Sequence, residues 1–138
     1  MTELYDTSAL ILAARHAGAA ETLREAIRGG GIAVTDIVLV EYLNGARSLA
    51  EYDRFAWSLG AADRLRAEPA DWDRVLDVHR LLAASGPGHQ WSVSLPDLVV
   101  AAVAERHGAT LVHYDEDYDR IAALTGQIVR WIVPRGTA

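Results

Sequence analysis

The sequence contains no cysteine and no lysine in its 138 residues. Without cysteine, the protein has no disulfide framework and no thiolate zinc site. Its longest apolar stretches, such as Leu98 to Ala104, are far shorter than the roughly 20 residues that span a bilayer, so no transmembrane helix is expected. The N-terminal residues also lack the basic start and long apolar core of a secretory signal. These absences predict a cytoplasmic protein without a membrane segment.

The motifs of several enzyme classes are missing as well. The five histidines lack the spacing of a zinc protease, no glycine-rich loop ends in lysine to bind a nucleoside triphosphate, and no serine lies in a nucleophile elbow. Gly86-Pro87-Gly88 lacks the remaining spacing of a dinucleotide-binding loop. These four kinds of site therefore explain the sequence poorly.

The net charge of −6 argues against non-specific binding to nucleic acid. It does not exclude such binding, because local clusters of charge decide whether a polyanion can approach. All 13 basic residues are arginine, whose planar guanidinium suits bidentate contact with phosphate. A bias of base composition toward arginine explains the same count.

Short apolar segments alternate with amphipathic ones along the whole chain, and no linker or repeat divides it. Strands are expected at 4–6, 32–35, 65–67, 110–113 and 127–133, the third being the weakest candidate. Helices are expected at 7–14, 19–28, 36–46, 49–59, about 72–83, 94–107 and 117–124. This order predicts a single α/β domain over residues 1–138, with a mainly parallel sheet of about five short strands flanked by helices.

Four carboxylates lie at the ends of apolar segments, where an ionised group is seldom buried unless it is paired or bound to metal. They are Asp6, Glu41, Asp97 and Asp115. In a parallel α/β fold the carboxyl ends of the strands and the N-termini of the helices meet at one edge of the sheet, so the four should converge there. Like charges that close together must bind protons or a cation. Carboxylate and water oxygens suit Mg²⁺, with Mn²⁺ as the second choice.

Each of these acids also has a purely structural explanation. Ser94-x-x-Asp97 has the form of a capping box, and an acid in the first turn of a helix is favoured by the helix dipole. Asp6 can begin a helix, Asp115 can cap the next helix, and Glu41 can be a solvated residue on a helix surface. The metal-site interpretation depends on all four acids coming together.

Three side chains near these acids have two interpretations each. His113 can contact a phosphate or be a hydrogen-bonded histidine at a strand end. His89 and Trp91, in a loop rich in glycine and proline, can stack on bases or pack against the fold. Arg15 and Arg47 follow the helices of Asp6 and Glu41, which makes them candidates for guiding a polyanionic substrate.

At these residues the chain resembles a PIN domain and, within that family, the VapC toxins of bacterial toxin–antitoxin pairs. The resemblance covers essentially the whole chain. It rests on the order and spacing of Asp6-Thr7-Ser8-Ala9-Leu10, Thr35 to Glu41, Leu95-Pro96-Asp97-Leu98, and the segment LVHYDEDYDRI at 111–121.

The resemblance implies an endoribonuclease that cleaves RNA phosphodiester bonds with a metal-activated water. Asp6 and Asp97 would be direct ligands of Mg²⁺ or Mn²⁺, while Glu41 and Asp115 would hold the water or a second ion. It also implies a cognate VapB-type antitoxin as partner and a homodimer. His113 stands where the family tends to carry Thr or Ser, which leaves Asp117 as an alternative to Asp115 for the fourth acid; we favour Asp115.

Other functions remain open at this point. A phosphoacceptor receiver domain also places acids at the carboxyl edge of a parallel sheet, but receivers use a lysine that this chain lacks. A catalytically inactive module could use the same fold and its acidic edge to bind a basic peptide. A nuclease acting on DNA also fits, because nothing in the sequence recognises the 2′-hydroxyl.

Overall fold

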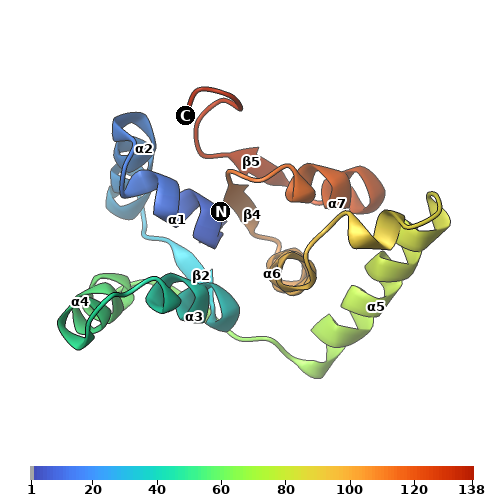
Figure 1. Cartoon of the computed structure of the whole chain (residues 1–138), viewed down its shortest axis with the longest axis horizontal. Coiled ribbons are helices and arrows are strands. Elements are labelled where there is room, and N and C mark those ends of the chain that lie inside the picture. Colours follow the sequence, from blue (N-terminus) through green and yellow to red (C-terminus); the bar gives the residue numbers. More distant parts are fainter. Residues whose placement is uncertain (1) are drawn as a thin grey trace.

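The computed structural model describes residues 2–138. Five parallel strands form one sheet in the order β3-β2-β1-β4-β5 (Figure 1). The strands are β1 (Glu3–Tyr5), β2 (Ala33–Thr35), β3 (Asp63–Leu65), β4 (Thr110–His113) and β5 (Val129–Trp131). The predicted α/β fold with a parallel sheet is confirmed.

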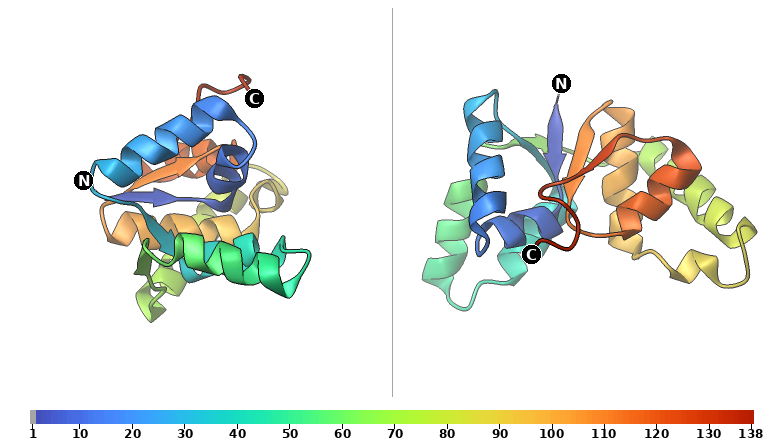
Figure 2. Two further views of the ribbon diagram at one scale, coloured as in Figure 1. Left: turned by 90° about the vertical axis from the view of Figure 1, so that its left-hand side faces the viewer. Right: turned by 90° about the horizontal axis from the view of Figure 1, so that it is seen from above.

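Helices cover both faces of this sheet, with α2 above and α6 below β1 in the left-hand view of Figure 2. The helices are α1 (Thr7–Ala13), α2 (Ala17–Arg28), α3 (Asp36–Asn44), α4 (Leu49–Leu59), α5 (Pro69–Ala84), α6 (Leu95–Arg106) and α7 (Asp117–Thr125), with a 3₁₀ turn η1 (His89–Trp91). No helix within residues 2–138 has the length and hydrophobicity needed to cross a bilayer.

The third strand differs from the prediction. It begins and ends two residues before the expected segment 65–67, because its parallel register pairs Ala33 with Asp63 and Thr35 with Leu65. The chain then turns toward Pro69, which opens α5 at a position where its missing N–H costs nothing. Edge strands of three residues carry too weak an apolar pattern to fix their limits from sequence.

The core is centred on α6, in which every residue from Asp97 to Ala104 is buried. Its small alanine and valine side chains let the helix pack closely against the sheet, α5 and α7. Ser94 caps this helix, and Pro96 occupies its first turn. As a result, Asp97 is held at a buried helix N-terminus on the edge where the strands end.

That carboxyl edge gathers side chains from distant parts of the sequence. Asp6 directly follows β1, Thr35 ends β2, and Asp115 follows β4 by two residues. The right-hand view of Figure 2 shows the chain running from the N-terminus through β1 to α1 on this edge, where η1 also lies. The edge therefore combines strand ends with the N-termini of α1, α3, α6 and α7.

Candidate active site

Asp6 begins α1 and also faces the centre of the carboxyl edge. Its Oδ2 accepts hydrogen bonds from the backbone N–H of Ser8 (3.0 Å) and from the Ser8 hydroxyl (2.6 Å). Its Oδ1 accepts a bond of 2.6 Å from the hydroxyl of Tyr118. The helix-start explanation is therefore right for one oxygen, while the other oxygen of this buried residue belongs to the cluster.

Asp97 does not form the capping box that its spacing suggests. Ser94 Oγ accepts the Asp97 N–H at 3.4 Å, but the N–H of Ser94 is bound by Asp117 Oδ2 (3.2 Å) instead of by the Asp97 carboxylate. Asp97 Oδ1 lies 3.1 Å from the Tyr118 hydroxyl. The Asp97 carboxylate is therefore directed to the cluster and not to its own helix.

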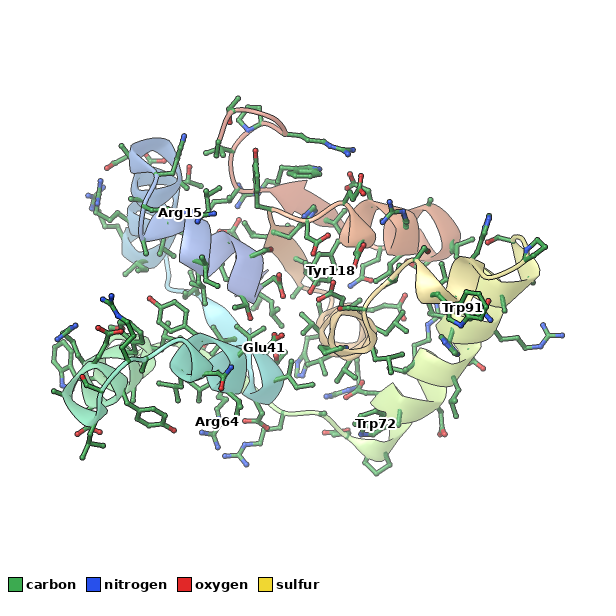
Figure 3. All side chains as sticks on the ribbon, viewed as in Figure 1. Arg15, Glu41, Arg64, Trp72, Trp91 and Tyr118 are labelled. Atoms are coloured by element: carbon green, nitrogen blue, oxygen red, sulfur yellow. The ribbon has the colours of Figure 1, made fainter. Side chains whose placement is uncertain are left out.

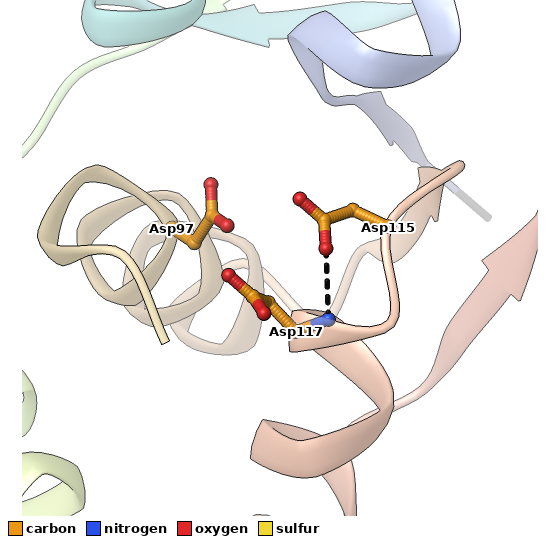
Figure 4. Close-up of side chains that lie close together, drawn as sticks. All are labelled: Asp97, Asp115 and Asp117. Atoms are coloured by element: carbon orange, nitrogen blue, oxygen red, sulfur yellow. Dashed lines mark hydrogen bonds between the residues drawn. The ribbon is translucent and has the colours of Figure 1, made fainter. Parts of the chain in front are cut away.

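Asp97, Asp115 and Asp117 come together tightly (Figure 4). Each offers one carboxylate oxygen, and the three oxygens lie within 4.8 Å of one another. Asp115 Oδ1 accepts the N–H of Asp117 at 2.9 Å, so Asp115 also helps to begin α7. Asp117 is otherwise occupied, because its Oδ1 accepts a hydrogen bond of 2.8 Å from Arg120 and its Oδ2 is bound to Ser94.

Glu41 lies beside this group but is not one of the three closest acids. Its Oε1 accepts a hydrogen bond of 2.9 Å from the hydroxyl of Thr7, the residue that follows Asp6. Its side chain is exposed and comes from α3, on the other side of the edge from α7 (Figure 3). The acidic edge therefore has a buried centre and an accessible carboxylate at its margin.

Three acids at the centre of the carboxyl edge carry negative charge that no ion pair with arginine balances in the described part of the chain. Among residues 2–138, no arginine pairs with Asp6, Asp97 or Asp115. Burial, together with the charge of Asp6 and a hydrogen bond with Asp117, raises the pKa of Asp97 to about 7. Burial likewise raises the pKa of Asp115 above its ordinary value. Asp6, Asp97 and Asp115, with Asp117 beside them, offer an all-oxygen ligand set that fits a hard divalent cation.

Tyr118 is a site residue that the sequence interpretation missed. Its hydroxyl lies between Asp6 Oδ1 and Asp97 Oδ1, and burial with these two charges raises its pKa well above the ordinary value. It therefore remains a neutral donor. Its spacing from Ile121 indicates a core-facing ring, but only the fold shows which carboxylates meet the hydroxyl.

His113 is completely buried, so the phosphate-contact interpretation is wrong and the strand-end interpretation is right. Its Nδ1 accepts the backbone N–H of Asp115 at 3.1 Å. The ring packs between Tyr118 and Trp131, with centroid distances of 5.1 and 4.9 Å. Burial lowers the pKa of His113, which favours the neutral ring. A Thr or Ser hydroxyl at this position could accept the same N–H, and here an imidazole nitrogen does so.

The structure gives different surroundings to the other side chains that the sequence singled out, which are Arg15, Arg47, His89 and Trp91. Arg47 pairs with Glu51 at 3.5 Å, whereas Arg15 forms no ion pair with any residue in 2–138. His89 is hydrogen-bonded to the Ser85 hydroxyl at 3.0 Å. Trp91 is 82% exposed, so the expectation that it packs against the fold is wrong.

Comparison with known proteins identifies the family. The sequence profile of the PIN domain matches residues 4–124, most of the chain. The chain belongs to the PIN-domain family. Among similar proteins, Ribonuclease VapC18 of Mycobacterium tuberculosis is 43% identical over 132 residues, covering 96% of both chains. Ribonuclease VapC51 of the same organism is 41% identical over 136 residues, covering 97% of this chain and 95% of that protein.

Solved structures with low sequence identity share this fold. The structure of VapBC-1 from nontypeable Haemophilus influenzae matches with a TM-score of 0.78 at 15% identity, covering 96% of this chain and 98% of that chain. VapBC2 from Rickettsia felis, bound to a DNA fragment from its promoter, matches with a TM-score of 0.76 at 17% identity over 95% and 98% of the two chains. The predicted membership of the PIN family is confirmed.

Proposed function

We propose that this PIN-domain protein is a metal-dependent endoribonuclease and the toxin of a toxin–antitoxin pair. The observation that carries the proposal is the group of Asp97, Asp115 and Asp117 next to Asp6, in which burial and the charge of Asp6 raise the pKa of Asp97. The VapC ribonucleases that resemble the whole chain support RNA as the substrate. Nucleolytic cleavage is a reaction that such a group performs with a divalent cation.

Within this proposal, Asp6, Asp97 and Asp115 hold the ion, which is Mg²⁺ with Mn²⁺ as the alternative. When bound, the ion supplies Lewis-acid activation of water and offsets the charge that develops on the phosphoryl oxygens. Asp117 is a positioning residue in this scheme, since Arg120 and the N–H of Ser94 already occupy its oxygens. This assignment favours Asp115 over Asp117 as the fourth acid.

The protein's own groups fix the carboxylates that would bind the ion. Ser8 and Tyr118 restrain Asp6 from two sides, and the same Tyr118 hydroxyl restrains Asp97. The Asp115 loop is held through its own N–H by His113. Such restraint reduces the reorganisation needed when substrate arrives. Glu41, which is exposed and accepts a hydrogen bond from Thr7 next to Asp6, would help to hold the water.

The proposed partner is a VapB-type antitoxin, because the curated relatives are VapC proteins and the solved neighbours are VapBC complexes. An apolar groove of about 370 Å³ between α1, α2 and α4 offers a surface for an amphipathic segment. It is lined by Leu10, Leu23, Ile27, Tyr42 and Leu59, among others. We also propose that the protein forms a homodimer and acts in the cytoplasm.

The test uses purified protein, a panel of structured RNAs, and DNA strands of matching sequence. Cleavage of RNA that requires Mg²⁺ or Mn²⁺, stops in chelator, and is lost in Asp97→Asn supports the proposal. Asp53→Asn, which changes an exposed carboxylate on α4, is the matched control and should cleave like the unmodified protein. Cleavage that persists in Asp97→Asn, or that acts on DNA alone, contradicts the proposal.

A further inference from the structure

Trp91 presents a large aromatic surface to solvent at the carboxyl edge. It is 82% exposed and ends the turn η1, between α5 and α6. Figure 3 shows it on the α5 side of the molecule, and Figure 2 shows η1 on the same edge as the start of α1. The exposed ring is therefore on the edge that carries the acidic site.

The turn that carries Trp91 is firmly built. Gly88 has φ of +76°, and a Cβ there would come within 2.9 Å of the Trp91 ring, so only glycine allows the indole to lie this close to the backbone. The N–H of Trp91 donates to Gly88 O at 2.9 Å, and the N–H of Ser92 donates to His89 O at 3.0 Å. Val93, which follows Ser92 and is 3% exposed, anchors the end of this turn in the core. The ring is thus displayed from a fixed turn and not from a loose loop.

Direct contacts link this turn to the acidic centre. Arg120 donates to Ser92 O at 3.3 Å and to Asp117 Oδ1 at 2.8 Å through the same nitrogen. Only five residues lie between Trp91 and Asp97, so their Cα atoms are at most about 22 Å apart even if this segment were fully extended. A single strand of RNA whose phosphate lies at Asp97 can therefore reach Trp91 within a few nucleotides.

We propose that Trp91 is a stacking platform for an unpaired RNA base next to the cleavage site, an inference that rests on the proposed ribonuclease function. The acidic edge repels phosphates, and Arg120, which donates to Ser92 O beside this turn, is already paired with Glu116 and Asp117. Contact with an uncharged base face avoids that repulsion. Stacking on an aromatic ring tolerates any base, so Trp91 contributes affinity for single strands and little sequence preference.

The test measures binding of a labelled 12-nucleotide single-stranded RNA of random sequence, and of a 12-base-pair RNA duplex, by fluorescence anisotropy with Ca²⁺ in place of Mg²⁺. Trp91→Ala should weaken binding of the single strand by about 5- to 150-fold, and Trp91→Phe should restore most of it. Binding of the duplex should not change. Trp57→Ala is the matched control, because Trp57 is 84% exposed on α4 and should have no effect.

A second measurement identifies which nucleotide of the RNA stacks on Trp91. In an RNA that the protein cuts, abasic nucleotides are introduced one at a time near the cut. One position should raise KM in the unmodified protein and lose that effect in Trp91→Ala. Equal affinities for the unmodified protein and Trp91→Ala overturn the inference while leaving ribonuclease activity intact. A changed oligomeric state with unchanged RNA binding also overturns it, since the ring then contacts protein. Absence of RNA cleavage by the unmodified protein defeats the proposed function itself.

Discussion

Two buried aspartates, one at each end of α6, differ in whether they have an arginine partner and in the direction of their pKa shifts. Asp71, 1% exposed, accepts hydrogen bonds of 2.8 and 3.1 Å from Arg106, the last residue of α6, and 2.8 Å from the N–H of Glu68. Burial alone would raise the pKa of Asp71, but these bonds outweigh it and lower the pKa. Asp97, in the first turn of the same helix, has no guanidinium partner among residues 2–138, and its pKa rises to about 7.

The difference is the one expected between an acid that only stabilises the fold and an acid of the proposed metal site. This chain pairs a buried carboxylate with arginine where only stability is required, and Asp71 joins α5 to α6 in that way. Around Asp97 it supplies hydroxyl groups, from Tyr118 and Ser94, and further carboxylates, with no arginine paired to Asp97 within residues 2–138. Such an arrangement destabilises the protein without a cation, which is the cost expected of a site prepared for one.

The largest expected effect is on the stability of the metal-free protein. The folded pKa of Asp97, about 7, exceeds the ordinary 3.8, so between these values the folded state binds a proton that the unfolded state has released. Stability should therefore fall as pH rises from about 4 to 7. In chelator at pH 7.5, Asp97→Asn should raise the free energy of unfolding by about 1 to 4 kcal/mol.

Denaturant unfolding from pH 4 to 8 measures this effect. The gain in Asp97→Asn should become small near pH 4, where the folded carboxyl is neutral and the unfolded one is only about half ionised, and Mg²⁺ should stabilise the unmodified protein more than the variant. An Asn variant that is less stable than the unmodified protein at pH 7.5 would show that the carboxylate is structural, and the contrast with Asp71 would be lost.

The second largest effect is a loss of stability. Asp71→Asn removes the buried carboxylate that accepts two hydrogen bonds from the partly exposed Arg106, and should lower the free energy of unfolding by about 2 to 3 kcal/mol. Because the folded pKa of Asp71 is lowered, its contribution is present above pH 3.8 and is lost as pH falls through the folded value. Glu105→Gln is the control: its pair with Arg74 is about one-third exposed and should cost less than about 1 kcal/mol. Equal losses in both variants would contradict this ranking.

The contrast between Asp71 and Asp97 could be predicted only in part from the sequence. The parallel topology and the position of Asp97 at a helix start follow from apolar periodicity and from Ser94, and both predictions were confirmed. The partner of the Ser94 N–H was not predictable, because Asp117 lies 23 residues away. The same limit applies to Tyr118, whose hydroxyl meets Asp6 across 112 residues. Periodicity shows which face is buried, but not which polar groups meet there.

Removing the Tyr118 hydroxyl should have the third largest effect. Tyr118→Phe keeps the ring against His113 but removes the donor that Asp6 and Asp97 share, so in chelator at pH 7.5 the free energy of unfolding should fall by about 2 kcal/mol. The hydrogen bond from Tyr118 lowers the pKa of Asp97, so its removal should move the loss of stability to higher pH.

Tyr114→Phe is a matched control for Tyr118→Phe. The Tyr114 hydroxyl accepts the N–H groups of Gly136 and Ala138 in the C-terminal tail and, within residues 2–138, is hydrogen-bonded to no carboxylate. Tyr114→Phe should leave the pH dependence of the free energy of unfolding unchanged. If the two variants gave the same pH profile in chelator, the Tyr118 hydroxyl would have no special relation to the acidic centre.

The smallest effect is expected when the hydrogen bond between the Asp115 N–H and His113 is removed. In His113→Asn the amide oxygen can take the place of Nδ1 and accept the Asp115 N–H, whereas His113→Leu leaves that N–H without its partner. The two replacements have similar size, so the loss of packing in the buried position is comparable. His113→Leu should therefore be less active than His113→Asn by about 5- to 10-fold in kcat, equivalent to roughly 1 kcal/mol. Equal kcat values at matched stability would mean that the position of Asp115 does not depend on this hydrogen bond, and that the imidazole at 113 serves only to fill the space between Tyr118 and Trp131.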